Sequence, residues 1–71
     1  MIFRSETFEN LAVRMERWYN ISIRFADEKI KPRKLTGIFE NESIQQALKA
    51  LQEITPFAYK INKNEVMISS R

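Results

Sequence analysis

Ile2-Phe3-Arg4-Ser5-Glu6-Thr7 is followed, 36 residues later, by the similar stretch Ile38-Phe39-Glu40-Asn41-Glu42-Ser43. The same offset aligns the apolar positions that come next: Phe8, Leu11, Ala12, Met15, Trp18, Ile21, Ile23 and Phe25 with Ile44, Ala47, Leu48, Leu51, Ile54, Phe57, Tyr59 and Ile61. Two copies are too few for a solenoid, which needs about three or more units. The pattern therefore predicts a single domain over residues 1–71, in which two similar halves (1–26 and 37–62) pack together and a strand over 65–70 closes the fold.

Each half contains one amphipathic helix, because its apolar residues recur at three- and four-residue spacing after the first strand. Thr7 is a suitable N-cap for the first helix, and Asn20 can end it in the left-handed conformation. Ser43 begins the second helix, with Gln46 at the spacing of a capping box. Pro56 stops that helix, because proline lacks the amide and clashes with the preceding turn.

The remaining segments alternate with period two, which is typical of half-buried strands. Strands are predicted at 1–4, 21–25, 35–40, 57–61 and 65–70. Asn62-Lys63-Asn64 is a tight turn in which asparagine accepts positive φ, and residues 27–34 form a charged connection. The prediction is an α+β fold of two βαβ repeats (βαβ–βαββ), with the first strand beside the third and the second beside the closing hairpin.

The residue inventory argues against catalysis. The chain has no His and no Cys, so the usual general base, thiol nucleophile and metal ligands are missing. Its single glycine, Gly37, excludes a phosphate-cradling loop. There is no run of about 18 apolar residues that could span a membrane. We expect a non-enzymatic domain with no cofactor, no metal and no membrane contact of its own.

One basic cluster is present, formed by Lys29, Lys31, Arg33 and Lys34. It can be interpreted as a phosphate-binding loop or, more commonly for charges in a connection, as a solvated segment. KH and RNA-recognition folds need glycines that this chain lacks. Nucleic acid is therefore not the expected partner, and a small basic nucleic-acid-binding module is only a runner-up hypothesis.

Apolar residues supply the stronger binding candidates. If Phe3 and Phe39 point into the core, alternation turns Ile2 and Ile38 outward. They would then form a partner surface, with an edge strand open to β-augmentation, or lie under a loop or the other half. Trp18 is interpreted as a core residue that continues the helix stripe, although tryptophan is also enriched in exposed binding anchors.

At this level of detail the sequence resembles the C-terminal domain of FecR-like anti-sigma regulators, and the resemblance covers nearly the whole chain. The similar segments are Arg17-Trp18-Tyr19-Asn20-Ile21-Ser22-Ile23, then Leu35-Thr36-Gly37-Ile38-Phe39-Glu40-Asn41-Glu42-Ser43, then Thr55-Pro56-Phe57-Ala58-Tyr59-Lys60-Ile61 with the hairpin strand after it. Pro56 stands where the family often has glycine.

The resemblance implies a fold like the short signalling domains of TonB-dependent transducers and the first domain of secretins, with two helices between a two-stranded and a three-stranded sheet. It also implies a periplasmic domain of a longer, single-pass inner-membrane protein that relays a signal from an outer-membrane transducer to an extracytoplasmic-function sigma factor. The expected partner is the transducer's signalling domain. The candidate contact residues are Ile2, Ile38, Tyr19, Arg17, Lys31, Arg33 and Lys34.

Two alternatives stay open at the level of sequence. The same βαβ repeat serves as the signalling domain of the transducer itself and as the N-terminal domain of a secretin. Two copies of the chain could also pair through an open strand edge.

Overall fold

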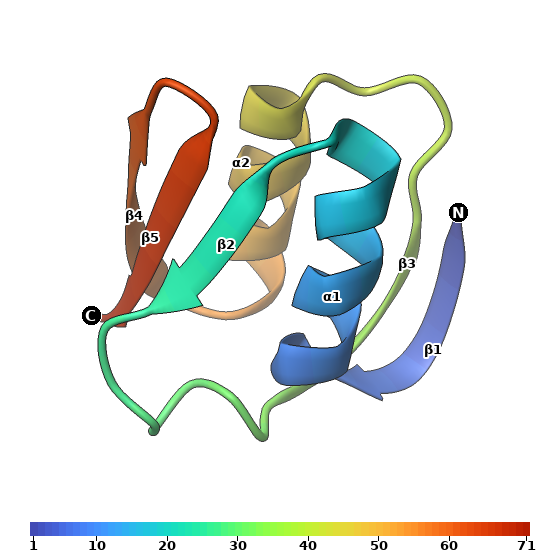
Figure 1. The fold of residues 1–71 in the computed structure, drawn as a ribbon. Coiled ribbons are helices and arrows are strands. Elements are labelled where there is room, and N and C mark those ends of the chain that lie inside the picture. Colours follow the sequence, from blue (N-terminus) through green and yellow to red (C-terminus); the bar gives the residue numbers. More distant parts are fainter.

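Two helices lie between a two-stranded and a three-stranded sheet (Figure 1), which confirms the α+β fold predicted from the sequence. The computed structural model describes all residues 1–71. Its elements are β1 (Ile2–Thr7), α1 (Phe8–Tyr19), β2 (Ser22–Phe25), β3 (Lys34–Ile38), α2 (Ile44–Ile54), β4 (Phe57–Asn62) and β5 (Glu65–Ser70). Neither helix has the length and apolarity that crossing a bilayer would require.

The strand order is the one that the internal repeat predicts. In the smaller sheet, β1 and β3 pair antiparallel and place Ile2 opposite Ile38, so equivalent residues of the two halves face each other. In the larger sheet, β5 lies in the centre, parallel to β2 and antiparallel to β4. The smaller sheet thus joins the two halves at one aligned pair, Ile2 and Ile38.

Both helices begin where their capping residues predict. The Thr7 hydroxyl accepts a hydrogen bond from the Asn10 amide at 3.1 Å, and the Ser43 hydroxyl accepts one from Gln46 at 3.1 Å. The Gln46 side chain returns a bond to the Ser43 amide at 2.9 Å, which completes the predicted capping box. Asn20 ends α1 with φ 54°, the left-handed conformation expected of it.

The core fills the space between the helices and the inner faces of both sheets. Aromatic rings dominate one end, where Phe8 meets Phe25 and Phe57 edge-on with ring centroids 5.4 and 5.2 Å apart. The rings of Phe3 and Phe39 pack under the smaller sheet with centroids 5.1 Å apart and planes tilted by 51°, and both residues are buried, which confirms that both point inward. The other buried residues of the helix stripes are Leu11, Ala12, Met15, Ala47, Leu48 and Leu51, as predicted.

The connection between β2 and β3 is less solvated than its charge suggests, because Ile30 within it is completely buried. In the turn between β4 and β5, Lys63 and not an asparagine carries the positive φ, at 58°. The prediction for that turn was right about its place and wrong about which residue is left-handed. Asn64 instead uses its carbonyl, which accepts a bond from the Ser22 amide at 2.9 Å.

The boundaries of β1 and β3 also differ from the predicted ones. β1 continues to Thr7 through an irregularity at Ser5, whose φ is 48° and whose amide donates to the Thr36 hydroxyl at 2.9 Å. β3 stops at Ile38 and does not reach Glu40, because the Glu40 amide binds the Glu42 carboxylate at 2.6 Å. Side-chain acceptors therefore shape both strands where simple alternation fails.

We expect Gly37→Ala to destabilise the fold by about 1–3 kcal/mol through overpacking. A Cβ at this position would lie 2.8 Å from the buried Phe3 ring. Urea unfolding measures the change, and the control is Lys34→Ala on the same strand, where the side chain is exposed. Alanine normally suits a strand better than glycine does, so a gain in stability would show that the ring does not require the open space.

We expect Asp27→Asn to lower stability at neutral pH and to lose this effect in acid. The Asp27 carboxylate accepts bonds from the Ser70 amide and hydroxyl, both at 2.9 Å, and these bonds lower its pKa. A lowered folded-state pKa gives stability above the unfolded pKa of about 3.9, lost as the pH falls through the folded value. Urea midpoints for both proteins between pH 7 and 2 should converge below about pH 4. A constant difference across this range would contradict the assignment.

Candidate functional site

Ile2 and Ile38 form an exposed apolar pair on the outer face of the smaller sheet. Met1 and Phe39 exchange both backbone hydrogen bonds, at 2.6 and 2.8 Å, so the next pair along, Ile2 and Ile38, is a non-hydrogen-bonded pair with closer side chains. The two isoleucines are 63% and 55% exposed. Their predicted outward orientation is confirmed, and the alternative that a loop covers them is wrong. Their role in binding stays a prediction.

The outer edge of β1 is closed by an arginine from α1. Arg14 donates to the Ile2 carbonyl at 2.9 Å and to the Glu6 carboxylate at 2.6 Å. Because Ile2 is a non-hydrogen-bonded residue in its pair with β3, this carbonyl points away from β3. The guanidinium therefore occupies an acceptor that an added strand would need.

Two further edges have a comparable side-chain bond. The Glu16 carboxylate of α1 accepts from the Ile23 amide of β2 at 2.8 Å. The Gln52 amide of α2 donates to the Phe57 carbonyl of β4 at 2.9 Å. Such contacts on unpaired backbone groups are one way in which proteins protect strand edges.

The outer edge of β3 differs from the other three. Alternation from the Phe39 pair directs the backbone groups of Thr36 and Ile38 away from β1. No side chain donates to or accepts from these groups. The side chains of both residues are exposed, and Ile38 continues into the apolar pair with Ile2. The smaller sheet thus has one open edge next to its apolar outer face.

Trp18 was predicted to lie in the core, and this prediction is wrong, because its side chain is 51% exposed. The reason is angular. Trp18 lies about 70° from the centre of the buried stripe of α1, whereas Tyr19 lies about 30° from it, at 100° per residue. Tyr19 therefore continues the stripe and packs against the core. The second half repeats this pattern, with Ile54 52% exposed and Thr55 buried.

The exposed indole lines a shallow hollow together with Met1, Arg14 and Arg17. Arg17 forms no ion pair, and Arg14 is already bound to β1. The hollow combines an aromatic face with two guanidinium groups, a residue combination that is enriched at protein interfaces. Arg17, a predicted contact residue, therefore lies beside Trp18, which the sequence had assigned to the core.

Tyr19, another predicted contact residue, is half-buried and not an exposed anchor. Its hydroxyl is shielded from solvent and has no hydrogen-bond partner. Burial, and after it the negative charge of Glu42, raises the pKa of this phenol above its ordinary value. The ring contributes mainly to packing at the end of α1.

The basic cluster is divided in the structure. Lys31 approaches Glu28 at 3.1 Å and Glu9 at 3.9 Å and lies 5.9 Å from the centre of the Phe25 ring. Arg33 donates to the Thr55 hydroxyl at 2.7 Å and to the Pro56 carbonyl at 3.1 Å. Of the four residues in this cluster, only Lys29 and Lys34 are exposed and have no such side-chain partner. The cluster therefore supports the fold and does not form one phosphate-binding surface.

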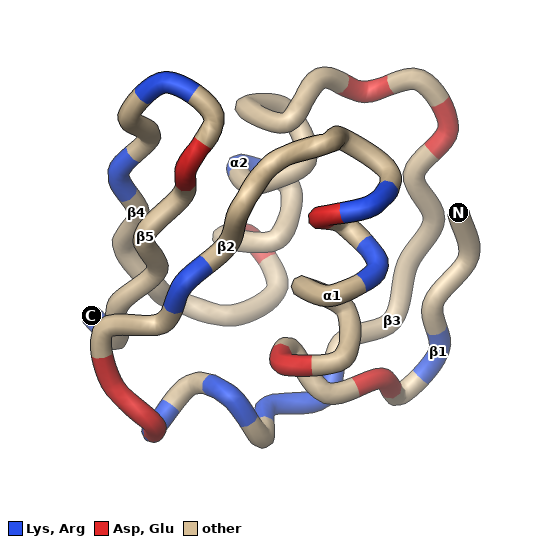
Figure 2. Tube along the Cα trace, in the orientation of Figure 1, with Lys and Arg blue, Asp and Glu red and all other residues tan.

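The distribution of charge separates the two ends of β3. Figure 2 shows basic and acidic residues on the connection before β3. On the connection between β3 and α2 the only charged residues are acidic, Glu40 and Glu42. Neither of these two carboxylates has an ion pair. Lys34, at one end of β3, is about 13 Å along the strand from Ile38 at the other. The predicted contact residues therefore do not form one patch.

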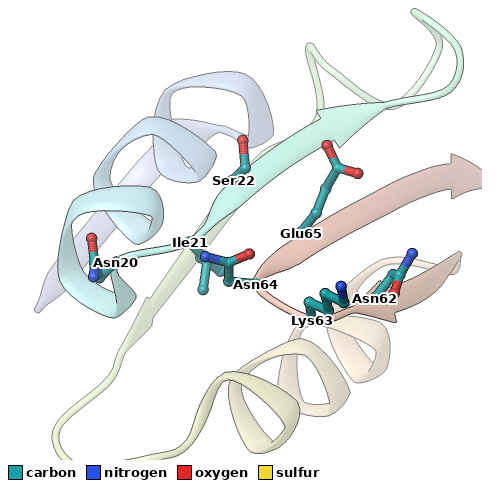
Figure 3. A pocket seen from close by; sticks show the side chains of 7 residues that line it. All are labelled: Asn20, Ile21, Ser22, Asn62, Lys63, Asn64 and Glu65. Atoms are coloured by element: carbon teal, nitrogen blue, oxygen red, sulfur yellow. The ribbon is translucent and has the colours of Figure 1, made fainter.

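Two hollows were not anticipated from the sequence. One is open and polar and lies between the end of α1 and the turn between β4 and β5 (Figure 3), lined by Asn20, Ile21, Ser22, Asn62, Lys63, Asn64 and Glu65. The other is a groove between α1 and β2, in which Val13 and Met67 are exposed. Val13 is an apolar residue that lies off the buried stripe of α1, and this was the sequence feature that could have indicated the groove. No cluster of three or more His, Cys, Asp or Glu residues suited to a metal is present.

The family described as FecR, C-terminal, matches residues 1–68, and the chain belongs to this family. No curated protein sequence matches the chain.

Two crystal structures of a candidate anti-sigma factor from Parabacteroides distasonis ATCC 8503, at 1.65 and 2.50 Å resolution, have the same fold. Each has a TM-score of 0.89 and 20% sequence identity to this chain. The match covers 100% of this chain and 34% or 33% of the other chain. The chain thus spans about a third of the structures that it matches.

We expect Trp18→Ala to change the free energy of unfolding by less than about 0.5 kcal/mol, as exposed surface substitutions do. Met15→Ala, on the buried stripe of the same helix, should cost about 2–5 kcal/mol. Urea unfolding followed by circular dichroism compares the two. A large loss of stability for Trp18→Ala would mean that the indole is part of the core and would contradict its exposure.

Proposed function

We propose that this chain is a non-enzymatic, periplasmic interaction domain of a FecR-like anti-sigma factor. In this role it binds the N-terminal signalling domain of a TonB-dependent outer-membrane transducer, and the signal passes on to an extracytoplasmic-function sigma factor. Membership of the FecR C-terminal family supports the class of protein. The candidate anti-sigma factor of the same fold agrees with it.

The observation that carries the binding role is the exposed pair of Ile2 and Ile38 beside the open edge of β3. Two isoleucines that are more than half exposed, on the outer face of a two-stranded sheet, leave apolar area in water that a partner can remove. The chain also has no His or Cys with which to build common catalytic sites. A surface for a protein partner is thus the best-supported use of this domain.

The competing nucleic-acid hypothesis loses its main support in the divided basic cluster. Lys31 and Arg33 are held by carboxylates, a hydroxyl and a carbonyl. A phosphate backbone would also make binding fall steeply with salt, whereas an apolar sheet surface predicts a shallow dependence.

The direct test is a titration of isotope-labelled domain with the purified signalling domain of a TonB-dependent transducer from the same organism. Backbone amide shifts that saturate and centre on β1 and β3 are the expected result. The absence of shifts at about millimolar partner would mean that the binding free energy is weaker than about −4 kcal/mol. That result would contradict binding by this domain alone.

We expect Ile38→Asp to weaken this binding at least about tenfold, because a charge would have to be buried in the apolar centre of the interface. Met67→Asp is the control. Met67 is also an exposed apolar residue, 38% exposed, and it lies on β5 in the three-stranded sheet, to which neither β1 nor β3 belongs. Isothermal titration measures both Kd values. Equal losses for the two variants would mean that the outer face of the smaller sheet is not the binding surface.

A further inference from the structure

The two halves of the chain have similar surroundings at several aligned positions. The N-caps Thr7 and Ser43 make the same bond three residues on, both at 3.1 Å. Trp18 and Ile54 are exposed to the same extent, 51% and 52%. Ile2 and Ile38, the residues that face each other across the smaller sheet, are themselves equivalent. The pairing of β1 with β3 thus lies on an approximate two-fold axis.

This symmetry is broken at one functional position. The equivalent of Arg14, which closes the edge of β1, is Ala50 on α2. The equivalents of its two acceptors are the Ile38 carbonyl and the Glu42 carboxylate. On the first half, the guanidinium bridges carbonyl and carboxylate at 2.9 and 2.6 Å. On the second half the aligned residue offers only a methyl group, and no cation binds either acceptor.

The groups on the second half remain available. Glu42 forms no ion pair, and one of its oxygens accepts only the amide of Glu40 at 2.6 Å. The Ile38 carbonyl points away from β1 and has no side-chain donor. The connection that follows β3 carries no Lys or Arg that could supply one (Figure 2). The absent arginine therefore leaves both an open strand edge and an unneutralised carboxylate at one place.

We propose that the outer edge of β3 is the docking edge for an extended strand of the partner, and that a basic side chain of that strand pairs with Glu42 over Ala50. This inference rests on the proposed function and names its contact. The partner's backbone N–H binds the Ile38 carbonyl, and its Arg or Lys occupies from outside the place that Arg14 occupies on the other half. Strand addition of this kind takes affinity from the main chain and specificity from alternate side chains.

A second copy of this chain fits the edge less well. In a two-fold antiparallel pair of β3 strands, the side chains brought to the helix side are Leu35, Gly37 and Phe39, none of which is basic. The only basic residue of β3, Lys34, alternates with these three and would lie on the outer face of the sheet, away from the helix side. The carboxylate therefore favours a different protein that carries a cation at an inward position of its strand.

The experiment compares two synthetic peptides that differ at one residue, Thr-Val-Thr-Arg-Thr-Val-Thr and the same peptide with Glu in place of Arg. Each is titrated into isotope-labelled domain, and the amide shifts of Thr36 and Ile38 are followed. We expect saturable shifts with the arginine peptide at millimolar concentration and binding at least about fivefold weaker with the glutamate peptide. Equal affinities, or shifts that centre on another strand, would overturn the proposal.

The variant Ala50→Arg installs the missing closure on β3 and should reduce binding of the arginine peptide at least about tenfold. Ala58→Arg adds the same charge at an exposed alanine of β4, in the larger sheet, and should leave binding unchanged. Unchanged binding by Ala50→Arg would overturn the assignment of the edge. Concentration-dependent shifts of Thr36 without peptide would overturn it in favour of a second copy. Binding of the transducer domain is tested separately with Ile38→Asp, so either result would overturn this assignment without overturning the proposed function.

Discussion

The antiparallel pairing of β1 with β3 is the interaction on which the rest of the structure depends. It joins the two halves at equivalent residues, with Ile2 opposite Ile38, and it directs Phe3 and Phe39 together onto the helices. A residue without a side chain suits position 37, because a Cβ there would lie 2.8 Å from the Phe3 ring. The same pairing leaves the two isoleucines outside. The burial of one face and the exposure of the other therefore have a single cause, the period-two alternation of a strand.

Much of the fold could be predicted because its signals are local. Caps, helix stripes and the repeat register depend on neighbours within a few residues, and Thr7, Asn20 and Ser43 act as expected. Trp18 was misplaced because spacing of three or four residues does not say where a stripe ends, and the angular position of Tyr19 does. Ile30 was overlooked because its charged neighbours gave the segment a polar appearance, while its burial depends on distant elements.

The candidate site was predictable in part for the same reason. Alternation was sufficient to turn Ile2 and Ile38 outward. The closure of three strand edges was not visible in the sequence, because it depends on how Arg14, Glu16 and Gln52 reach backbone groups of other elements. The basic residues illustrate the reverse case. They are adjacent in sequence, yet Lys31 and Arg33 are used by different neighbours within the fold.

The position of β5 has a consequence for the order of folding. β5 lies between β2 and β4, and it makes all the strand pairings of the larger sheet although it is the last element of the seven. During synthesis, β2 waits for a partner that follows it by about 40 residues, and closing such a loop slows folding. The smaller sheet, β1 with β3, can form before Glu65 leaves the ribosome, whereas strand pairing in the larger sheet cannot begin until then. Until then the inner faces of β2 and β4 are the surfaces that a chaperone would have to cover.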